Sequence, residues 1–97
     1  MLKTLIYVST GARQFSDEAL LEILAQSRSR NAALGVTGML LYDDGNFMQV
    51  LEGPPAAVDA LYDSIGGDSR HHSIIKILEE SSDVRSFPDW SMGFVHA

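Results

Sequence analysis

The side chains that could do chemistry in this sequence are neutral hydrogen-bonding groups set among apolar residues; they are Tyr7, Ser27, Asn31 and Gln49. Gln49 lies within the alternating run NFMQVLEG, which has the pattern of a buried strand. Because burying an amide without a partner costs about 1–3 kcal/mol, Gln49 needs something to bond. Side chains of this kind suit a planar heterocycle with donors and acceptors along its edge. Each of the four could instead be a core polar group bonded to the backbone or to another of the set.

Other kinds of site have little support in the sequence. It contains no paired carboxylates, no nucleophile beside a base and no GxGxxG motif, so we expect no catalytic residues. It contains no Cys, which excludes a cysteinyl adduct and cysteine-based metal sites. The three histidines, two of them adjacent at 71–72, are more typical of solvated loops than of metal ligands, and we expect no metal site.

Length and net charge limit the classes of protein to which this sequence can belong. Ninety-seven residues fit one small domain spanning 1–97. The formal net charge of −6 argues against nucleic acid or an anionic membrane as a partner, because both attract clustered Lys and Arg. No apolar run approaches the roughly 18 residues of a membrane span, and no signal peptide pattern opens the chain. We therefore expect a cytoplasmic protein.

The helices and strands that must position the four polar residues can be predicted from hydrophobic periodicity and from capping and turn residues. Ser16 is a helix cap, followed by acidic residues in the first turn. Asp-Asp-Gly-Asn predicts a hairpin turn within 34–53, and Pro54-Pro55 suits the start of a second helix that ends at Gly66-Gly67. The predicted order is strand 4–9, helix from 16 to about 30, hairpin 34–53, helix 55–66, strand 73–80 and, after Phe87-Pro88, strand 89–95.

This βαββαβ order with an added fifth strand predicts an α+β, ferredoxin-like domain with a mixed sheet and both helices on one face. We expect the first and third strands to lie side by side at the centre of the sheet, parallel to each other. Alternation then places Tyr7 and Gln49 on neighbouring strands and on the same face. The first helix directs Ser27 and Asn31 along the stripe that faces the sheet.

Four stretches together resemble the BLUF domain, a blue-light sensor that uses FAD: LIYVS, SRNAALGVTGMLLYDDGNFMQVLEG, DSRHHS and RSFPDWSMGF. They cover essentially the whole chain in order. The resemblance implies that Tyr7 is the photoactive tyrosine and Gln49 the switching glutamine, with Trp90 and Met92 as the fifth-strand pair that rearranges near Gln49. It implies that Gln49 bridges Tyr7 and the N5/O4 edge of the flavin. In that case light would drive coupled electron and proton loss from Tyr7, and Gln49 would rotate or tautomerise.

The resemblance also implies a set of cofactor-binding positions. Asn31 would bond the carbonyl and N3 edge of the ring, Ile23 and Ile65 would sandwich it, and Arg30 would face the ribityl chain or phosphate. The rim would be the D-x-R-H segment with Asp68, Arg70, His71 and His72, which could equally be structural. The full cofactor set is Ile23, Ser27, Arg30, Asn31, Ile65, Asp68 and His71. The expected cofactor is FAD, with FMN or riboflavin as substitutes.

The second face of the predicted sheet carries Ile6, Val8, Met48 and Val50. A bare apolar face of this kind marks an interface, so we expect a second copy of the chain, or an effector domain or protein, to cover it. Two other functions stay open. An acylphosphatase-like hydrolase would use Arg13 after the first strand, and a colourless ligand-binding regulatory module would share the topology.

Overall fold

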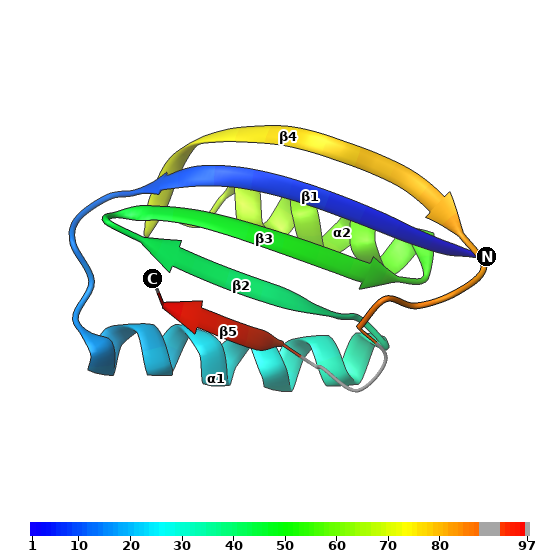
Figure 1. Ribbon diagram of the computed structural model, residues 1–97, viewed down its shortest axis with the longest axis horizontal. Helices are drawn as coiled ribbons and strands as arrows, with labels where there is room; N and C mark the ends of the chain where they lie inside the picture. The colour runs from blue at the N-terminus through cyan, green and yellow to red at the C-terminus, as the bar shows by residue number, and fades with distance from the viewer. Residues whose placement is uncertain (88–91, 97) are drawn as a thin grey trace.

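The structure is a computed structural model and describes residues 1–87 and 92–96. Figure 1 shows five strands and two helices in the order that the sequence predicts. The elements are β1 (Leu2–Gly11), α1 (Asp17–Leu34), β2 (Thr37–Asp43), β3 (Asn46–Gly53), α2 (Pro55–Gly66), β4 (His71–Ser82) and β5 (Gly93–His96). The predicted fifth strand, 89–95, thus lies partly outside the described residues.

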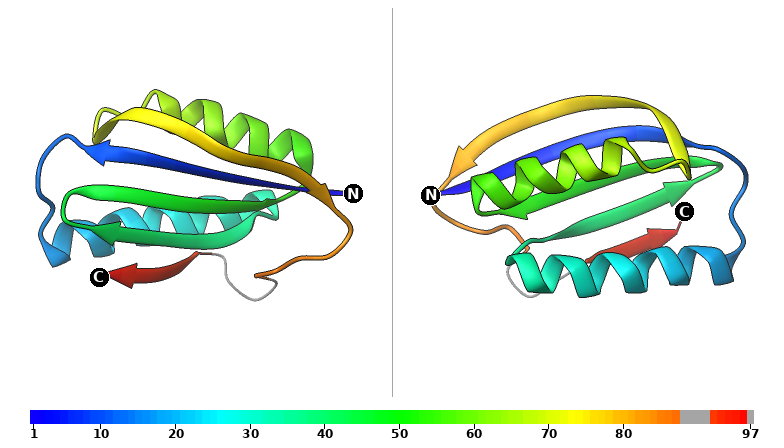
Figure 2. Two further views of the ribbon diagram at one scale, coloured as in Figure 1. Left: turned by 45° about the horizontal axis from the view of Figure 1, so that its top comes forward. Right: turned by 180° about the vertical axis from the view of Figure 1, so that it is seen from behind.

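The strands form one sheet in the order β4-β1-β3-β2-β5. Both helices lie on the same face of it, as the view from behind in Figure 2 shows. This two-layer arrangement confirms the ferredoxin-like prediction. The parallel pairing of β2 with β5 makes the sheet mixed.

The predicted direction of the central pair was wrong, because β1 and β3 are antiparallel. The right-handed crossover through α1 makes β1 run in the same direction as β2 and leaves a gap of one strand between them. β3 returns from β2 through a tight hairpin and fills that gap, so it runs against both neighbours.

Local signals account for the boundaries. The Ser16 side chain accepts a hydrogen bond from the Ala19 backbone N–H at 3.2 Å and caps α1. The helix continues to Leu34, past the predicted end near Arg30, and stops where Gly35 adopts a left-handed conformation with φ of 71°. The hairpin turn has positive φ at Asp44 and Gly45, as a two-residue turn between twisted strands requires.

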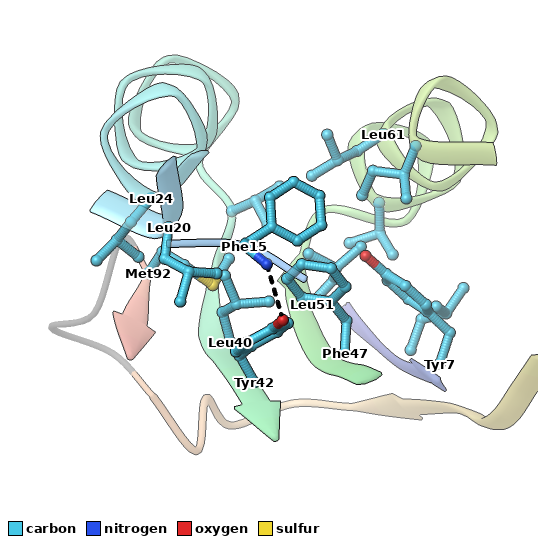
Figure 3. Close-up of a cluster of buried hydrophobic side chains, with 14 residues drawn as sticks. Tyr7, Phe15, Leu20, Leu24, Leu40, Tyr42, Phe47, Leu51, Leu61 and Met92 are labelled. Carbon is cyan, nitrogen blue, oxygen red and sulfur yellow. Dashed lines mark hydrogen bonds between the residues drawn. The ribbon is translucent and has the colours of Figure 1, made fainter. Parts of the chain in front are cut away.

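The core lies between the helices and the inward face of the sheet (Figure 3). Leu5, Leu51, Leu20 and Leu61 are almost fully buried there. Phe15 packs edge-on against the ring of Tyr42, whose hydroxyl accepts a hydrogen bond from the Phe15 backbone N–H at 3.1 Å. This contact fixes the loop after β1 over the ends of β2 and β3.

The outward face of the sheet is less covered. Ile6, Val8, Met48 and Val50 are half-buried, and Ile75 on β4 is 59% exposed. Among the described helices, none is long and apolar enough to cross a membrane.

Candidate functional site

Tyr7 and Gln49 face each other directly across the β1–β3 ladder. The Tyr7 hydroxyl donates a hydrogen bond to Oε1 of Gln49. On its other side, Nε2 of Gln49 donates to Sδ of Met92 at 3.6 Å. Each of these side chains is nearly inaccessible to solvent, with 3% of Tyr7 and of Gln49 exposed. The buried amide thus has a partner at each end and connects β1 and β3 with the residue that precedes β5.

A pocket opens over this pair on the helical face of the sheet. Ile23 from α1 and Ile65 from α2 supply apolar walls, as expected for a site that holds a flat ring. The lining residues are Tyr7, Ile23, Ser27, Arg30, Leu40, Phe47, Gln49, Ile65, Asp68, Arg70 and His71. Most of the predicted positions therefore gather around one pocket, although they come from five separate segments of the sequence.

Arg30 indicates that the pocket is built for a polar ligand. Its Nε is buried and has no hydrogen-bond partner among the described residues. Leaving such a donor unsatisfied is costly, and a flavin carries acceptors on its ring edge, its ribityl chain and its phosphates. The apolar walls, the amide of Gln49 and this donor together fit that cofactor.

Asp68 and Arg70 close the rim of the pocket. Nε of Arg70 donates to the Asp68 carboxylate at 2.9 and 3.0 Å, and the Arg70 backbone N–H donates to Oδ1 at 2.9 Å. These bonds from Arg70 hold the pKa of Asp68 below its usual range. Nη1 of Arg70 also donates to Oε1 of Gln26 at 3.0 Å, which fastens the turn after α2 to α1.

His71 lines the pocket and has a partner at each of its ring nitrogens. Its Nε2 is 2.8 Å from the Ile65 carbonyl oxygen, which only accepts, so Nε2 carries the proton. Nδ1 lies within hydrogen-bond distance of Oγ of Ser9, at 2.7 Å. The adjacent His72 is exposed and pairs with Ser73, outside the pocket.

The surroundings of Tyr7 keep its phenol protonated. Burial is the main cause and raises the pKa of Tyr7 well above its ordinary value, with the nearby Arg30 acting in the opposite direction. The phenolic proton therefore stays on Tyr7 and is donated to Oε1 of Gln49.

Besides His72, two predicted positions fall away from the pocket lining. Asn31 is completely buried on α1, one residue beyond Arg30, and is not among the lining residues. Met92 is buried and reaches the site through Gln49. Trp90 lies outside the described residues.

The sequence reasoning missed three groups. Leu40 lies opposite Gln49 in the β2–β3 register, and Phe47 lies two residues before Gln49 on the same face of β3. Alternation alone could have identified both. Arg28 was not predicted, and its Nε donates to the backbone carbonyl of Met92 at 3.0 Å. No spacing signal links that pair, because their elements meet only in the folded chain.

A family model described as "BLUF: Sensors of blue-light using FAD" matches residues 2–93. The chain belongs to the BLUF family. Among solved structures, "BlrB - a BLUF protein, dark state structure" is 40% identical with a TM-score of 0.93, covering 98% of this chain and 72% of that one. "Structure of a bacterial light-regulated adenylyl cylcase" is 37% identical with a TM-score of 0.95, and this chain covers 28% of it.

Curated BLUF relatives are much longer than this chain. The "Photoactivated adenylate cyclase subunit beta" of Euglena longa is 38% identical over 92 residues, which are 94% of this chain and 11% of that protein. The "Blue light- and temperature-regulated antirepressor BluF" of Escherichia coli (strain K12) is 36% identical over 87 residues, 90% of this chain and 22% of that protein. The shared part is the sensor domain of these BLUF proteins.

Proposed function

We propose that residues 1–97 form one photosensory domain that binds FAD without a covalent bond and responds to blue light through Tyr7 and Gln49. The observation that carries this proposal is the buried hydrogen bond from Tyr7 to Gln49 at the floor of the pocket. A core polar pair would need no opening above it and no unsatisfied donor beside it.

FAD supplies the absorption of blue light and, once excited, strong oxidising power. Tyr7 is the oxidisable group on the pocket floor. Loss of an electron makes a phenol far more acidic, so its proton moves along the existing hydrogen bond to Oε1 of Gln49. The carbonyl oxygen accepts it because Oε1 is the atom to which the Tyr7 hydroxyl already donates.

Gln49 is the element with two arrangements. In the structure its oxygen faces Tyr7 and its nitrogen faces Met92. Rotation of the amide, or its tautomer, exchanges donor and acceptor at these two ends without changing the volume of the side chain. After the exchange Met92, which directly precedes β5, would lose its hydrogen bond, since a thioether accepts the amide N–H but has no donor for an oxygen.

The proposed cofactor contacts come from both helices. Ile23 and Ile65 would sandwich the ring, while Arg30, Ser27 and Asn31 on α1 would bond its polar edge or tail. Asp68 and His71 shape the rim from which the tail emerges. Because recognition centres on the ring, FAD, FMN and riboflavin should bind within about tenfold of one another.

The signal requires a partner that the described chain does not contain. We propose that a second copy or an effector covers the outward face formed by Ile6, Val8, Met48 and Val50. BLUF relatives carry long additional sequence, which supports a covalently joined effector in the whole protein. The cytoplasmic location expected from the sequence stays a prediction that cell fractionation can test.

The deciding experiment is spectroscopic. Purified protein reconstituted with FAD should be yellow and should show a red-shifted difference spectrum, illuminated minus dark, that decays fully in darkness. A colourless protein that fails to retain flavin would contradict the proposal. A phosphatase assay in parallel tests the acylphosphatase alternative, whose Arg13 instead lies over the Phe15 ring at 5.3 Å.

A further inference from the structure

Met92 is held at two of its atoms by two different parts of the fold. Its Sδ accepts the amide N–H of Gln49 at 3.6 Å, and its backbone carbonyl oxygen accepts the Nε–H of Arg28 at 3.0 Å. The residue belongs to the buried core, with 1% of it exposed (Figure 3). One residue thus joins the switching amide on β3 to a guanidinium group on α1.

Arg28 lies on α1 where its side chain can reach the chain at the start of β5. It follows Leu24 by four residues and precedes Asn31 by three, so it borders the buried stripe of the helix. Figures 1 and 2 show β5 running beside α1. The residue as a whole is exposed, yet its Nε turns to the Met92 carbonyl, as a long side chain can do while its charged end stays in water.

β5 by itself is a weak support for Met92. The strand has four residues, Gly93–His96, and lies at the edge of the sheet beside β2. Its ladder begins with Gly93 opposite Met39, so Met92 lies just before the first pair. Chain at the end of such an element frays readily. The bond from Arg28 limits fraying at the residue whose sulfur has to stay beside Gln49.

We propose that Arg28 is a positioning residue for the light switch: by holding the Met92 carbonyl, it keeps the sulfur where the Gln49 amide binds it. This inference rests on the proposed function. Light exchanges the two ends of the Gln49 amide, and the return in darkness re-forms the bond from Nε2 to Sδ. An acceptor that is already in place speeds this return. Without the bond from Arg28, Met92 is in place for a smaller fraction of the time and the return slows.

Two substitutions separate the hydrogen bond of Arg28 from its charge. Arg28→Gln removes the charge but keeps an N–H donor, because the amide nitrogen of Gln follows Cδ as Nε of Arg does. Arg28→Leu removes the donor as well and suits a helix. A net hydrogen bond changes an equilibrium about fivefold. We therefore expect the red-shifted state to decay about three- to fivefold more slowly in Arg28→Leu and within about twofold of the wild-type rate in Arg28→Gln. Arg28→Ala also lacks the donor and replaces Arg28→Leu if that variant does not fold.

The position of Met92 can also be measured without light. The chain has four methionines, so ¹³C labelling of their methyl groups gives a simple NMR spectrum of the flavin-bound protein in darkness, and Met92→Leu identifies the resonance of Met92. In Arg28→Leu this resonance should shift or broaden, while those of Met39 and Met48 stay in place. In Arg28→Gln all of them should stay close to their wild-type positions.

A double variant tests whether Arg28 acts through the sulfur. Met92→Leu already lacks the acceptor, so adding Arg28→Leu to it should change the decay rate by less than about twofold, although Arg28→Leu alone slows the decay. A full further slowing in the double variant would show that Arg28 acts by another route and would overturn the proposal.

The remaining outcomes separate this proposal from the proposed function. A wild-type protein without a red-shifted state overturns the proposed function and the role of Arg28 in the switch with it. A normal wild-type photocycle with unchanged or faster decay in Arg28→Leu overturns the role of Arg28 alone. Equal slowing in Arg28→Gln also overturns it, because the charge would then be responsible, and so does a Met92 methyl resonance that does not change in Arg28→Leu.

Discussion

Replacing the buried pair one member at a time should reveal how tightly Tyr7 and Gln49 are coupled. In Gln49→Leu the Tyr7 hydroxyl loses its acceptor inside the core, where only 3% of the residue is exposed. An orphaned buried donor costs about 1–3 kcal/mol in the free energy of unfolding. In a domain of this size each kcal/mol lowers Tm by about 4–8 °C. Tyr7→Phe leaves the Gln49 oxygen without its donor and should cost a similar amount.

The double variant distinguishes a coupled pair from two separate core residues. With both polar ends of the bond removed, neither group is left unsatisfied there. The double variant should therefore lose about 1–2 kcal/mol less free energy of unfolding than the sum of the two single losses. The measurement is urea unfolding of the four proteins at saturating FAD, corrected for differences in flavin affinity. Tyr62→Phe is the matched control, because its ring lies 5.8 Å from that of Tyr7 and its hydroxyl is not the one bonded to Gln49.

The same proteins test the photochemistry. Tyr7→Phe and Gln49→Leu should stay folded and yellow, yet show no persistent red-shifted state under blue light. If the two single losses in free energy of unfolding add up to the loss in the double variant to within about 0.5 kcal/mol, the coupling is refuted. A red shift like that of the wild type in Gln49→Leu would refute the switching mechanism itself.

Three further outcomes follow from the described contacts. Arg30→Met should weaken FAD binding about tenfold, measured by titrating flavin into apoprotein, and equal affinity would remove Arg30 from the pocket. Gly38→Ala should prevent folding or shift β2, because an added Cβ would lie 1.9 Å from the Val50 carbonyl oxygen; circular dichroism showing a native fold would contradict this packing. The lowered pKa of Asp68 means that its pairing with Arg70 stabilises the fold above pH about 4, and this contribution disappears as pH falls through the lowered value; Asp68→Asn should flatten that acid limb in unfolding curves, and an unchanged limb would count against the pairing.

Much of the site could be predicted because alternation fixes which face a strand residue occupies. Once β1 and β3 are neighbours, Tyr7 and Gln49 must share the helical face whatever the direction of the strands. The error in that direction therefore did not move the pair. Direction depends on how three elements connect in space, and periodicity within each element carries no information about it.

The contacts that the sequence did not predict share a different property. Arg28 with Met92 and Glu52 with Phe87 join segments 64 and 35 residues apart through single bonds to the backbone. A backbone carbonyl or N–H looks the same at every position, so nothing in the local sequence marks it as a partner. Arg and Glu residues on a helix or strand are most often solvated, which makes such buried uses of them invisible without coordinates.

The two bonds made by Gln49 also bear on how the domain assembles. They connect positions 42 residues apart on one side and 43 on the other, which together span most of the chain. On a ribosome Tyr7 emerges early, Gln49 follows much later and Met92 later still, so this set of hydrogen bonds is complete only when nearly the whole domain has been synthesised. Contacts with such long sequence separation slow folding. A flavin that binds the finished pocket therefore captures complete molecules and draws the folding equilibrium toward them.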